Sequence, residues 1–243
     1  MRFKRLRAIY ICMMFIAVLT SCAFGKRKQK IAEELLSKKY GEEFVVTSYN
    51  GYGGIAGDYY TVTAYAKSCP QIPFEANVSG DETFVSDSYV SRKVCLSISN
   101  MIANNISALP CEYYVHTGIM SRDSVCSDPN VSIDEFVSKW EPDNRYYVYL
   151  YLSDKAVQGG ADSKAVYEAI KEAMNGLPDI DGNLSVYVSK DSTIKKVREY
   201  VESNAGLYDD YFKLAQDDYR GQFEFDDSVL AFTIQDAELI LGH

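Results

Sequence analysis

The clearest strand in this sequence is Arg145-Tyr146-Tyr147-Val148-Tyr149-Leu150-Tyr151-Leu152, in which aromatic and aliphatic residues alternate. Successive side chains of a strand point to opposite faces of a sheet, so Tyr147, Tyr149 and Tyr151 share one face. The aliphatic side chains of the other face belong in a core. The tyrosine face has two interpretations: an exposed platform on which a sugar or peptide stacks, or a second buried face beneath crossover helices.

The segments after this strand predict a parallel crossover. A helix is expected over residues 162–174 and a strand over residues 184–189. Such a strand–helix–strand succession places its two strands parallel in one sheet. The remaining elements expected in the C-terminal part are helices at 192–203 and 207–217 and a hairpin of residues 223–225 and 229–234.

The part before this strand predicts a second group of helices and strands. A helix is expected over residues 87–107, because Cys95, Ile98, Ile102 and Ile106 recur at helical spacing. The other elements expected here are a helix at 31–39, strands at 43–48, 59–67, 72–78 and 111–119, and a short helix at 132–140.

The predicted fold class is therefore α+β with mixed sheets and packed helices. An N-terminal α-β-β-β-α unit is followed by a unit that contains a β-α-β crossover. The boundary is expected in the loop near residues 121–130, which divides the body into subdomains 31–125 and 126–243, although one single domain remains an alternative.

The first 22 residues have the layout of a secretory signal. Four basic residues precede an apolar run of about a dozen residues, short of the roughly 20 that span a bilayer as a helix. The following Leu19-Thr20-Ser21-Cys22 resembles the lipobox of bacterial lipoproteins. That resemblance implies that residues 1–21 are removed and that Cys22 carries a diacyl anchor facing outside the cytoplasm. An ordinary signal peptide with a chance cysteine is the alternative.

A short basic segment, residues 22–30, follows the lipobox. It carries Lys26, Arg27, Lys28 and Lys30 without an intervening acid. Lipid anchors hold best with a second signal, and basic residues beside an anionic membrane supply one at about 1 kcal/mol per charge. The alternative is a solvated linker whose charges keep it soluble.

The body that follows is strongly acidic. From residue 31 onward it carries 17 Lys and Arg against 34 Asp and Glu, a net charge of −17. Phosphate backbones would repel such a body, so a nucleic-acid partner is not expected. The 20 tyrosines against one tryptophan suit strands and binding surfaces.

No motif in the sequence predicts a catalytic, cofactor or metal site. Gly51-x-Gly53-x-x-Ala56 precedes a β-branched segment and lacks the helix that a dinucleotide site needs. Ser192-x-x-Lys195 lacks the Lys-Thr-Gly element of penicillin-recognising enzymes, and Asp179-x-Asp181 lacks the glycine and carboxylate positions of a calcium loop. With His116 and His243 as the histidines, a histidine zinc site or catalytic triad is not expected.

Four cysteines follow Cys22 in the body: Cys69, Cys95, Cys111 and Cys126. An even number in an exported protein permits two disulfides. The pairs Cys69–Cys95 and Cys111–Cys126 are favoured, because a helix separates Cys95 from Cys111 by well over the reach of a disulfide. Four small buried thiols are the alternative.

The sequence therefore predicts a surface lipoprotein that acts as a non-catalytic binding or accessory module. Its expected partner is a protein or an envelope polymer, and no cofactor is expected. A membrane-tethered hydrolase with a scattered site and a structural component of an envelope complex are the alternatives.

Overall fold

The computed structural model of the protein describes residues 25–50, 59–83, 85–106, 109, 111–119, 126–141, 145–159, 162–204, 214–226 and 229–242. The fold is α+β, with a four-stranded sheet and a five-stranded sheet. The chain divides into two compact units. Unit 1 runs up to Cys69 and includes Glu75–Ser86, whereas unit 2 comprises Pro70–Phe74 and the chain from Asp87 onward. This division lies near Ser86, while the boundary expected between residues 125 and 126 falls inside unit 2.

Unit 1 contains a helix over residues 25–40 and the four-stranded sheet. The sheet has the order β1 (Phe44–Asn50), β2 (Tyr59–Ala66), β3 (Cys69–Ser79) and β4 (Val85–Asp87), and β1 pairs antiparallel with β2. The helix buries its apolar face, including Ala32 and Leu36. It ends where Gly41 adopts a φ of 73° and donates to the carbonyl of Ser37, a C-terminal cap that glycine forms without strain.

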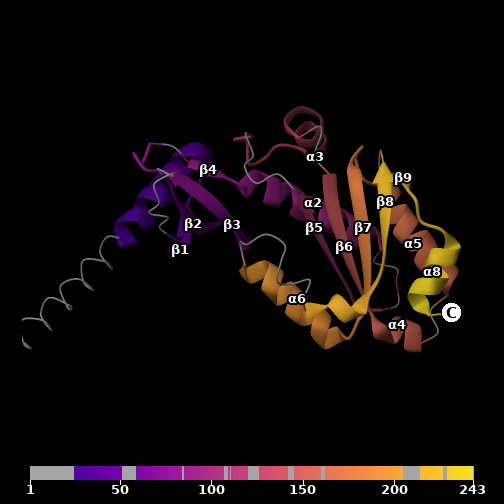
Figure 1. The fold of residues 1–243 in the computed structure, drawn as a ribbon. Helices are drawn as coiled ribbons and strands as arrows, with labels where there is room; N and C mark the ends of the chain where they lie inside the picture. The colour runs from indigo at the N-terminus through magenta and orange to yellow at the C-terminus, as the bar shows by residue number, and fades with distance from the viewer. Residues whose placement is uncertain are drawn as a thin grey trace, which may run out of the picture. The chain divides into compact units, whose positions relative to one another are not determined.

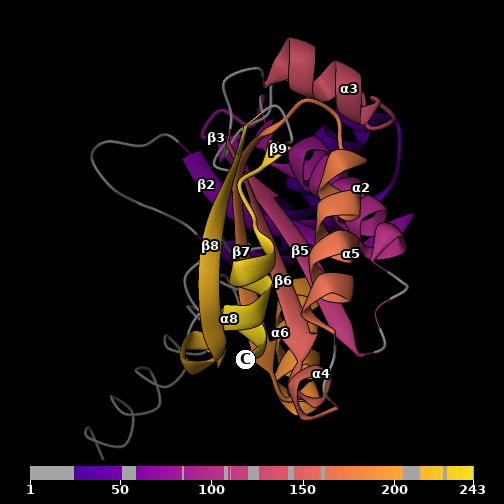
Figure 2. The same cartoon turned by 90° about the vertical axis from the view of Figure 1, so that its right-hand side faces the viewer.

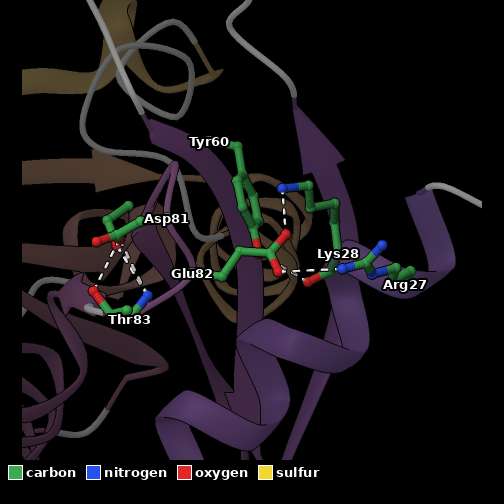
Figure 3. Close-up of polar contacts among 7 residues, drawn as sticks. Arg27, Lys28, Tyr60, Asp81, Glu82 and Thr83 are labelled. Carbon is green, nitrogen blue, oxygen red and sulfur yellow. Dashed lines mark hydrogen bonds and ion pairs between the residues drawn. The ribbon is translucent and has the colours of Figure 1, made fainter.

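The helix of unit 1 begins earlier than the sequence predicts, because residues 25–30 are helical rather than a linker. A polar cluster holds this first turn against the sheet (Figure 3). Lys28 Nζ lies 2.5 Å from Glu82 Oε1 and 4.7 Å from the centre of the Tyr60 ring, and the Tyr60 hydroxyl donates to the Lys28 carbonyl at 3.2 Å. Arg27 Nη2 lies 3.7 Å from Glu82 Oε2. Lys28, one of the basic residues expected to face a membrane, thus contributes to the packing of unit 1.

Unit 2 contains the five-stranded sheet, whose strand order is β5-β6-β7-β8-β9 (Figure 1). The strands are β5 (Tyr113–Ile119), β6 (Arg145–Ser153), β7 (Asp181–Ser189), β8 (Tyr219–Asp226) and β9 (Val229–Leu230). β6 and β7 are parallel and are joined through α4 (Asp154–Gln158) and α5 (Ser163–Asn175), which confirms the predicted crossover. The other neighbouring pairs are antiparallel.

Helices cover both faces of this sheet. In Figures 1 and 2, α5 and α8 (Ile234–Leu241) lie on one side of the sheet and α6 (Asp191–Ser203) on the other. The aliphatic side chains of β6 pack on the first side, where α2 (Tyr89–Asn105) also lies against β5. The predicted core face of α2 is confirmed, since Cys95, Ile98, Ile102 and Ile106 are buried.

The ends of several elements differ from the sequence prediction. Ile234 begins α8 instead of ending a strand, because Thr233 and Asp236 form a reciprocal capping box. The short helix expected at 132–140 is present as α3 (Ile133–Glu135), which Ser132 caps by accepting from Glu135 N, and a π-helix (Phe136–Trp140) extends it. The helix expected at 192–203 begins one residue earlier, at Asp191. The glycine turn at 51–57 lies outside the described residues, as does most of the helix expected at 207–217.

Candidate functional site

A groove of about 370 Å³ runs along the outer edge of β5 in unit 2. We call this feature the β5 groove. Every residue of β5 from Tyr113 to Ile119 lines it, together with one side of α2, the last turn of α6, and Gln71 and Ile72. The groove exists because β5 is the edge strand of its sheet, with β6 on its other side.

The α2 wall of the β5 groove consists mainly of small side chains. Ser88, Ser91, Cys95, Ser99 and Ala103 recur at spacings of three or four residues and so fall on one side of the helix. The Ser91 hydroxyl donates to the Ser88 carbonyl at 3.0 Å, and the Ser99 hydroxyl donates to the Cys95 carbonyl at 2.9 Å. These serine donors are therefore already used within the helix.

The β5 wall presents backbone groups instead. Ser153 N donates to the Glu112 carbonyl at 2.9 Å, so Glu112 and every second residue after it point their backbone groups toward β6. The alternate residues point theirs into the groove, and the Tyr113 carbonyl indeed accepts from Arg198 Nη2 at 3.3 Å. The outward backbone groups of Val115 and Thr117 have no hydrogen bond to a described residue.

Thr117 adds a second unsatisfied group to this wall. Its side chain is 2% exposed, and its Oγ1 has no hydrogen-bond partner among the described residues. A buried hydroxyl without a partner costs about 1–3 kcal/mol, so such groups are normally paired. Because this hydroxyl is fully buried, the hydrogen-bonding groups that β5 offers to the groove are those of its backbone.

The charges of the β5 groove are two guanidinium groups and, among its described lining residues, one carboxylate, that of Glu202. Arg198 also lies 3.3 Å from Glu112 Oε1 and packs 5.2 Å from the centre of the Tyr114 ring. Arg92 Nη2 donates to the Asn204 carbonyl at 3.4 Å. The two guanidinium groups are thus matched by two carboxylates, Glu202 in the groove and Glu112 beside it, within a strongly acidic protein.

Two side chains of the β5 groove could act in catalysis, His116 and Cys95, and both stay neutral near pH 7. Burial, reinforced by the charge of Arg92, lowers the pKa of His116 to about 3, and its ring stacks on Tyr149. Burial also raises the pKa of the Cys95 thiol to about 12. The groove therefore has neither a titrating histidine nor a thiolate nucleophile at pH 7.

The tyrosine face of β6 lies largely under α6. Tyr149 is 4% exposed and Tyr151 is fully buried, whereas Tyr147 is half-buried. The interpretation as an exposed platform is therefore wrong for Tyr149 and Tyr151, and the other interpretation, a second buried face, is correct for them. Parallel strands in α/β crossovers are covered on both sides, which is the physical reason.

Four tyrosines on this face form a row across four strands, which we call the tyrosine ladder. Tyr114, Tyr151, Tyr187 and Tyr219 are register partners on β5, β6, β7 and β8. Successive ring centres are 6.2, 4.7 and 5.5 Å apart. Ile194 and Val197 of α6 cluster with Tyr151 and Tyr187, which makes the middle of the ladder part of the core, whereas Tyr219 at its end is 45% exposed.

A second, open depression of about 400 Å³ lies at the start of α6, among Glu112, Asp191, Lys195, Arg198 and Glu199. Its charges are paired with one another. Asp191 bonds Lys155 and accepts from Ser153 Oγ at 2.5 Å, and the hydrogen bond from Lys155 lowers the pKa of Asp191. Lys195 pairs with Glu199 at 3.8 Å. The depression is best described as a solvated ion-pair network.

The remaining predicted site residues lie apart from the groove or outside the described residues. The four body cysteines are thiols in the structure, and neither favoured disulfide is formed. Cys95 alone among them lines the β5 groove, and Cys22 is outside the described residues. Among the described residues, no group of three or more His, Cys, Asp or Glu is arranged to hold a metal ion. No described helix is both long and apolar enough to cross a bilayer.

Sequence reasoning missed the β5 groove because three separate elements build it. The signal that could have indicated it is the stripe of small residues on α2, Ser88 to Ala103, beside the predicted core face. The side of a helix that faces a groove, rather than a packed core, does not need large side chains to fill space. Neither Arg92 nor Arg198 stands in a recognisable motif.

Comparisons with known proteins identify a family. A family model described as a domain of unknown function, DUF5037, matches residues 29–212. A crystal structure of a DUF5037 family protein from Ruminococcus gnavus matches with a TM-score of 0.64 and 16% sequence identity, covering 89% of this chain and 100% of that chain. At this identity, the similarity concerns the fold. No curated protein matches the chain.

Proposed function

Since the chain belongs to the DUF5037 family, a domain of unknown function, we propose that it is a membrane-anchored, non-catalytic binding module whose ligand occupies the β5 groove. The observation that carries this proposal is the combination of an open, partly unsatisfied groove with side chains that are inert near neutral pH. Such a site offers recognition without acid–base or nucleophilic chemistry.

The hydrolase alternative fits this groove less well. Many glycoside hydrolases need two carboxyl groups about 5–10 Å apart. Among the described residues that line the groove, Glu202 supplies the carboxylate, and His116 is held neutral. Binding is therefore the better use of these side chains.

The proposed anchor is a lipid on Cys22. Support comes from the Leu19-Thr20-Ser21-Cys22 sequence and from the basic residues Lys26, Arg27 and Lys30 that follow it. Ala23 and Phe24 separate Cys22 from Gly25, where the described helix is already present, so unit 1 would be held within about 10 Å of the lipid. Lys28 is engaged by Glu82, whereas Arg27 and Lys30 are in longer, exposed ion pairs of 3.7 Å with Glu82 and 3.8 Å with Glu34, pairs that an anionic membrane could replace.

The anchor is tested by expressing the full chain with a clickable palmitate analogue and separating membranes from soluble protein. We expect the wild type to be labelled and to pellet with membranes. Cys22→Ala should lose the label and move to the soluble fraction, whereas Cys69→Ala should behave as the wild type. A Cys22→Ala protein that stays in the membrane pellet would contradict the lipid anchor.

The binding site is tested by photo-crosslinking in cells that express the full chain. A flexible aliphatic diazirine amino acid, which lacks the bulk of a large aromatic ring and leaves the groove open, replaces Asn100, an exposed residue that lines the β5 groove, or Leu239, which is 73% exposed on α8. We expect ultraviolet light to give adducts of higher mass from position 100 and not from position 239. Equal adducts at both positions, or none at position 100, would refute the groove as the binding site.

A further inference from the structure

We infer that the β5 groove binds an extended peptide of a partner protein, which pairs with β5 and extends the five-stranded sheet by one strand. This inference rests on the proposed function and names the class of ligand. Addition of a strand to an exposed sheet edge is a recurring mode of peptide recognition, in which main-chain hydrogen bonds supply affinity.

The hydrogen-bonding pattern of the groove selects a peptide backbone. The outward N–H and carbonyl groups of Val115 and Thr117 alternate along the strand. The serine hydroxyls of the facing α2 wall are already bonded within the helix. A ligand that satisfies this one wall needs donors and acceptors repeating at strand spacing, as another strand has.

The dimensions of the groove fit an elongated ligand. Its β5 wall has seven residues, about 23 Å of strand. Its α2 wall extends from Ser88 to Ala103, about 22 Å of helix. The two walls therefore run the length of a peptide of about six or seven residues, rather than enclosing one compact molecule.

The guanidinium groups of the groove favour a peptide with an acidic residue, because each offers several N–H donors to a carboxylate. Arg92 and Arg198 line the groove together with Glu202, and Arg198 also lies 3.3 Å from Glu112 Oε1 beside the groove. Because Arg198 already donates to the Tyr113 carbonyl, it marks the end of the groove at which an acidic side chain would be preferred. The acidic surface elsewhere on the protein would discourage acidic segments from binding outside the groove.

A second copy of this chain is a poorer occupant. The β5 edge lies between the α2 wall and the end of α6, and any second copy carries the same two helices beside its own β5. Pairing of two such edges at roughly 4.8 Å would also bring the α2 and α6 helices of both copies side by side and would require them to fit together. A single peptide strand has no such requirement.

The test uses the lipidated full chain in detergent micelles and a phage library of random 12-residue peptides. We expect selection to enrich peptides that bind, and a synthetic copy of the strongest one is then N-methylated at each position in turn. Methylation at every second position should weaken binding at least tenfold, while methylation at the alternate positions should change it less than twofold. This alternation is the signature of a strand paired on one edge.

Matched variants locate the peptide on the protein. Asn100→Trp fills the groove from an exposed position on α2, whereas Ser97→Trp places the same side chain on an exposed position outside it. We expect the first to abolish binding and the second to leave it unchanged.

Three outcomes would overturn the inference: no enriched peptide, equal effects of methylation at all positions, or peptide binding that survives Asn100→Trp. If the peptide test fails while position 100 still crosslinks in cells, the proposed binding function stands and its ligand is not a peptide strand. If both fail, the groove is not the binding site. Dimerisation that Asn100→Trp prevents would instead identify a second copy as the occupant.

Discussion

At the scale of single residues, β6 contains two buried phenol groups without hydrogen-bond partners among the described residues. Tyr146 points to the aliphatic face and Tyr151 to the ladder face, yet neither hydroxyl is paired. Burial raises the pKa of both phenols well above the usual range. Such groups lower the stability of the fold, because a buried hydroxyl has lost its hydrogen bonds to water without gaining one in the protein.

Removing the Tyr151 hydroxyl is therefore expected to be harmless or stabilising. Tyr151→Phe should raise the free energy of unfolding by up to about 1 kcal/mol in urea denaturation. Tyr113→Phe is the matched control, because the Tyr113 hydroxyl donates to the Ala103 carbonyl at 2.9 Å, and its loss should cost about 1 kcal/mol. A loss of more than 1 kcal/mol in Tyr151→Phe would show that its hydroxyl has a stabilising partner.

His116 makes stability depend on pH. Its folded pKa of about 3 lies below the unfolded value near 6.5, so the unfolded chain binds a proton first as the pH falls. The stability contributed by neutral His116 is complete above about pH 6.5 and is lost as the pH falls toward 3. Between pH 7 and pH 5, the wild type should lose about 2 kcal/mol more than His116→Gln, measured by urea denaturation. Equal losses in the two proteins would contradict this assignment.

At the scale of elements, the β6–β7 pair depends on one glycine. A Cβ atom at Gly182 would lie 1.9 Å from the Tyr146 carbonyl oxygen and 2.6 Å from the Phe225 ring. Neither the neighbouring backbone nor a fully packed ring can move away cheaply.

Gly182→Ala should therefore lower the free energy of unfolding by about 3 kcal/mol or more. Gly25→Ala is the matched control, because a Cβ there meets nothing within 4 Å and alanine favours the helix. We expect that control to be neutral or stabilised by up to about 1 kcal/mol in the same denaturation experiment. Comparable effects of the two substitutions would exclude the close approach of β6.

Elements with a strong period could be predicted from the sequence. The alternation around Tyr149 predicted β6, and the helical spacing from Cys95 to Ile106 predicted α2 and its core face. Element ends were harder to predict. Val229 to Ile234 contains β-branched and aromatic residues typical of a strand, but the Thr233–Asp236 capping box starts α8 there. Local hydrogen bonds outweighed strand propensity at that point.

The basic segment before Ile31 shows how tertiary contacts change a local prediction. Its charges are typical of a linker, yet Lys28 finds Glu82 and Tyr60, residues more than 30 positions away in the sequence. Helix formation then extends over residues 25–30. No pattern within the segment itself reveals that partner.

At the scale of the whole molecule, the two units share one strand. Residues Pro70–Phe74 of β3 belong to unit 2, where Phe74 packs 5.1 Å from Tyr89 between ring centres, while Cys69 and Glu75–Ser79 belong to unit 1. A continuous strand cannot easily keep its middle ordered while both of its ends unfold.

We therefore expect unfolding of unit 1 to weaken unit 2. Leu36→Ala removes a fully buried side chain from unit 1 and should cost about 2–5 kcal/mol. Native-state hydrogen exchange by mass spectrometry should show reduced protection in β1 and β2 and also in β6 and β7. Ile170→Ala, in unit 2, is the reciprocal control. Reduced protection confined to β1 and β2 would show that the units unfold independently.

The candidate site belongs to this largest scale, which explains why the sequence did not reveal it. Which strand lies at the edge of a sheet depends on the order β5-β6-β7-β8-β9, and no local pattern distinguishes β5 from an interior strand. Arg92, Thr117 and Arg198 line the same groove only because the fold brings α2, β5 and α6 together. The sequence could predict the class and the strands, but not the open edge.

The tyrosine ladder also gives the protein an optical property. Four phenol rings held 4.7–6.2 Å apart in a fixed, chiral arrangement should couple their electronic transitions. In a chain with 20 tyrosines and one tryptophan, a near-ultraviolet circular dichroism band should therefore arise largely from the assembled face beneath α6. Loss of that band with retained far-ultraviolet signal would mark the moment at which this face loosens, without any label attached to the protein.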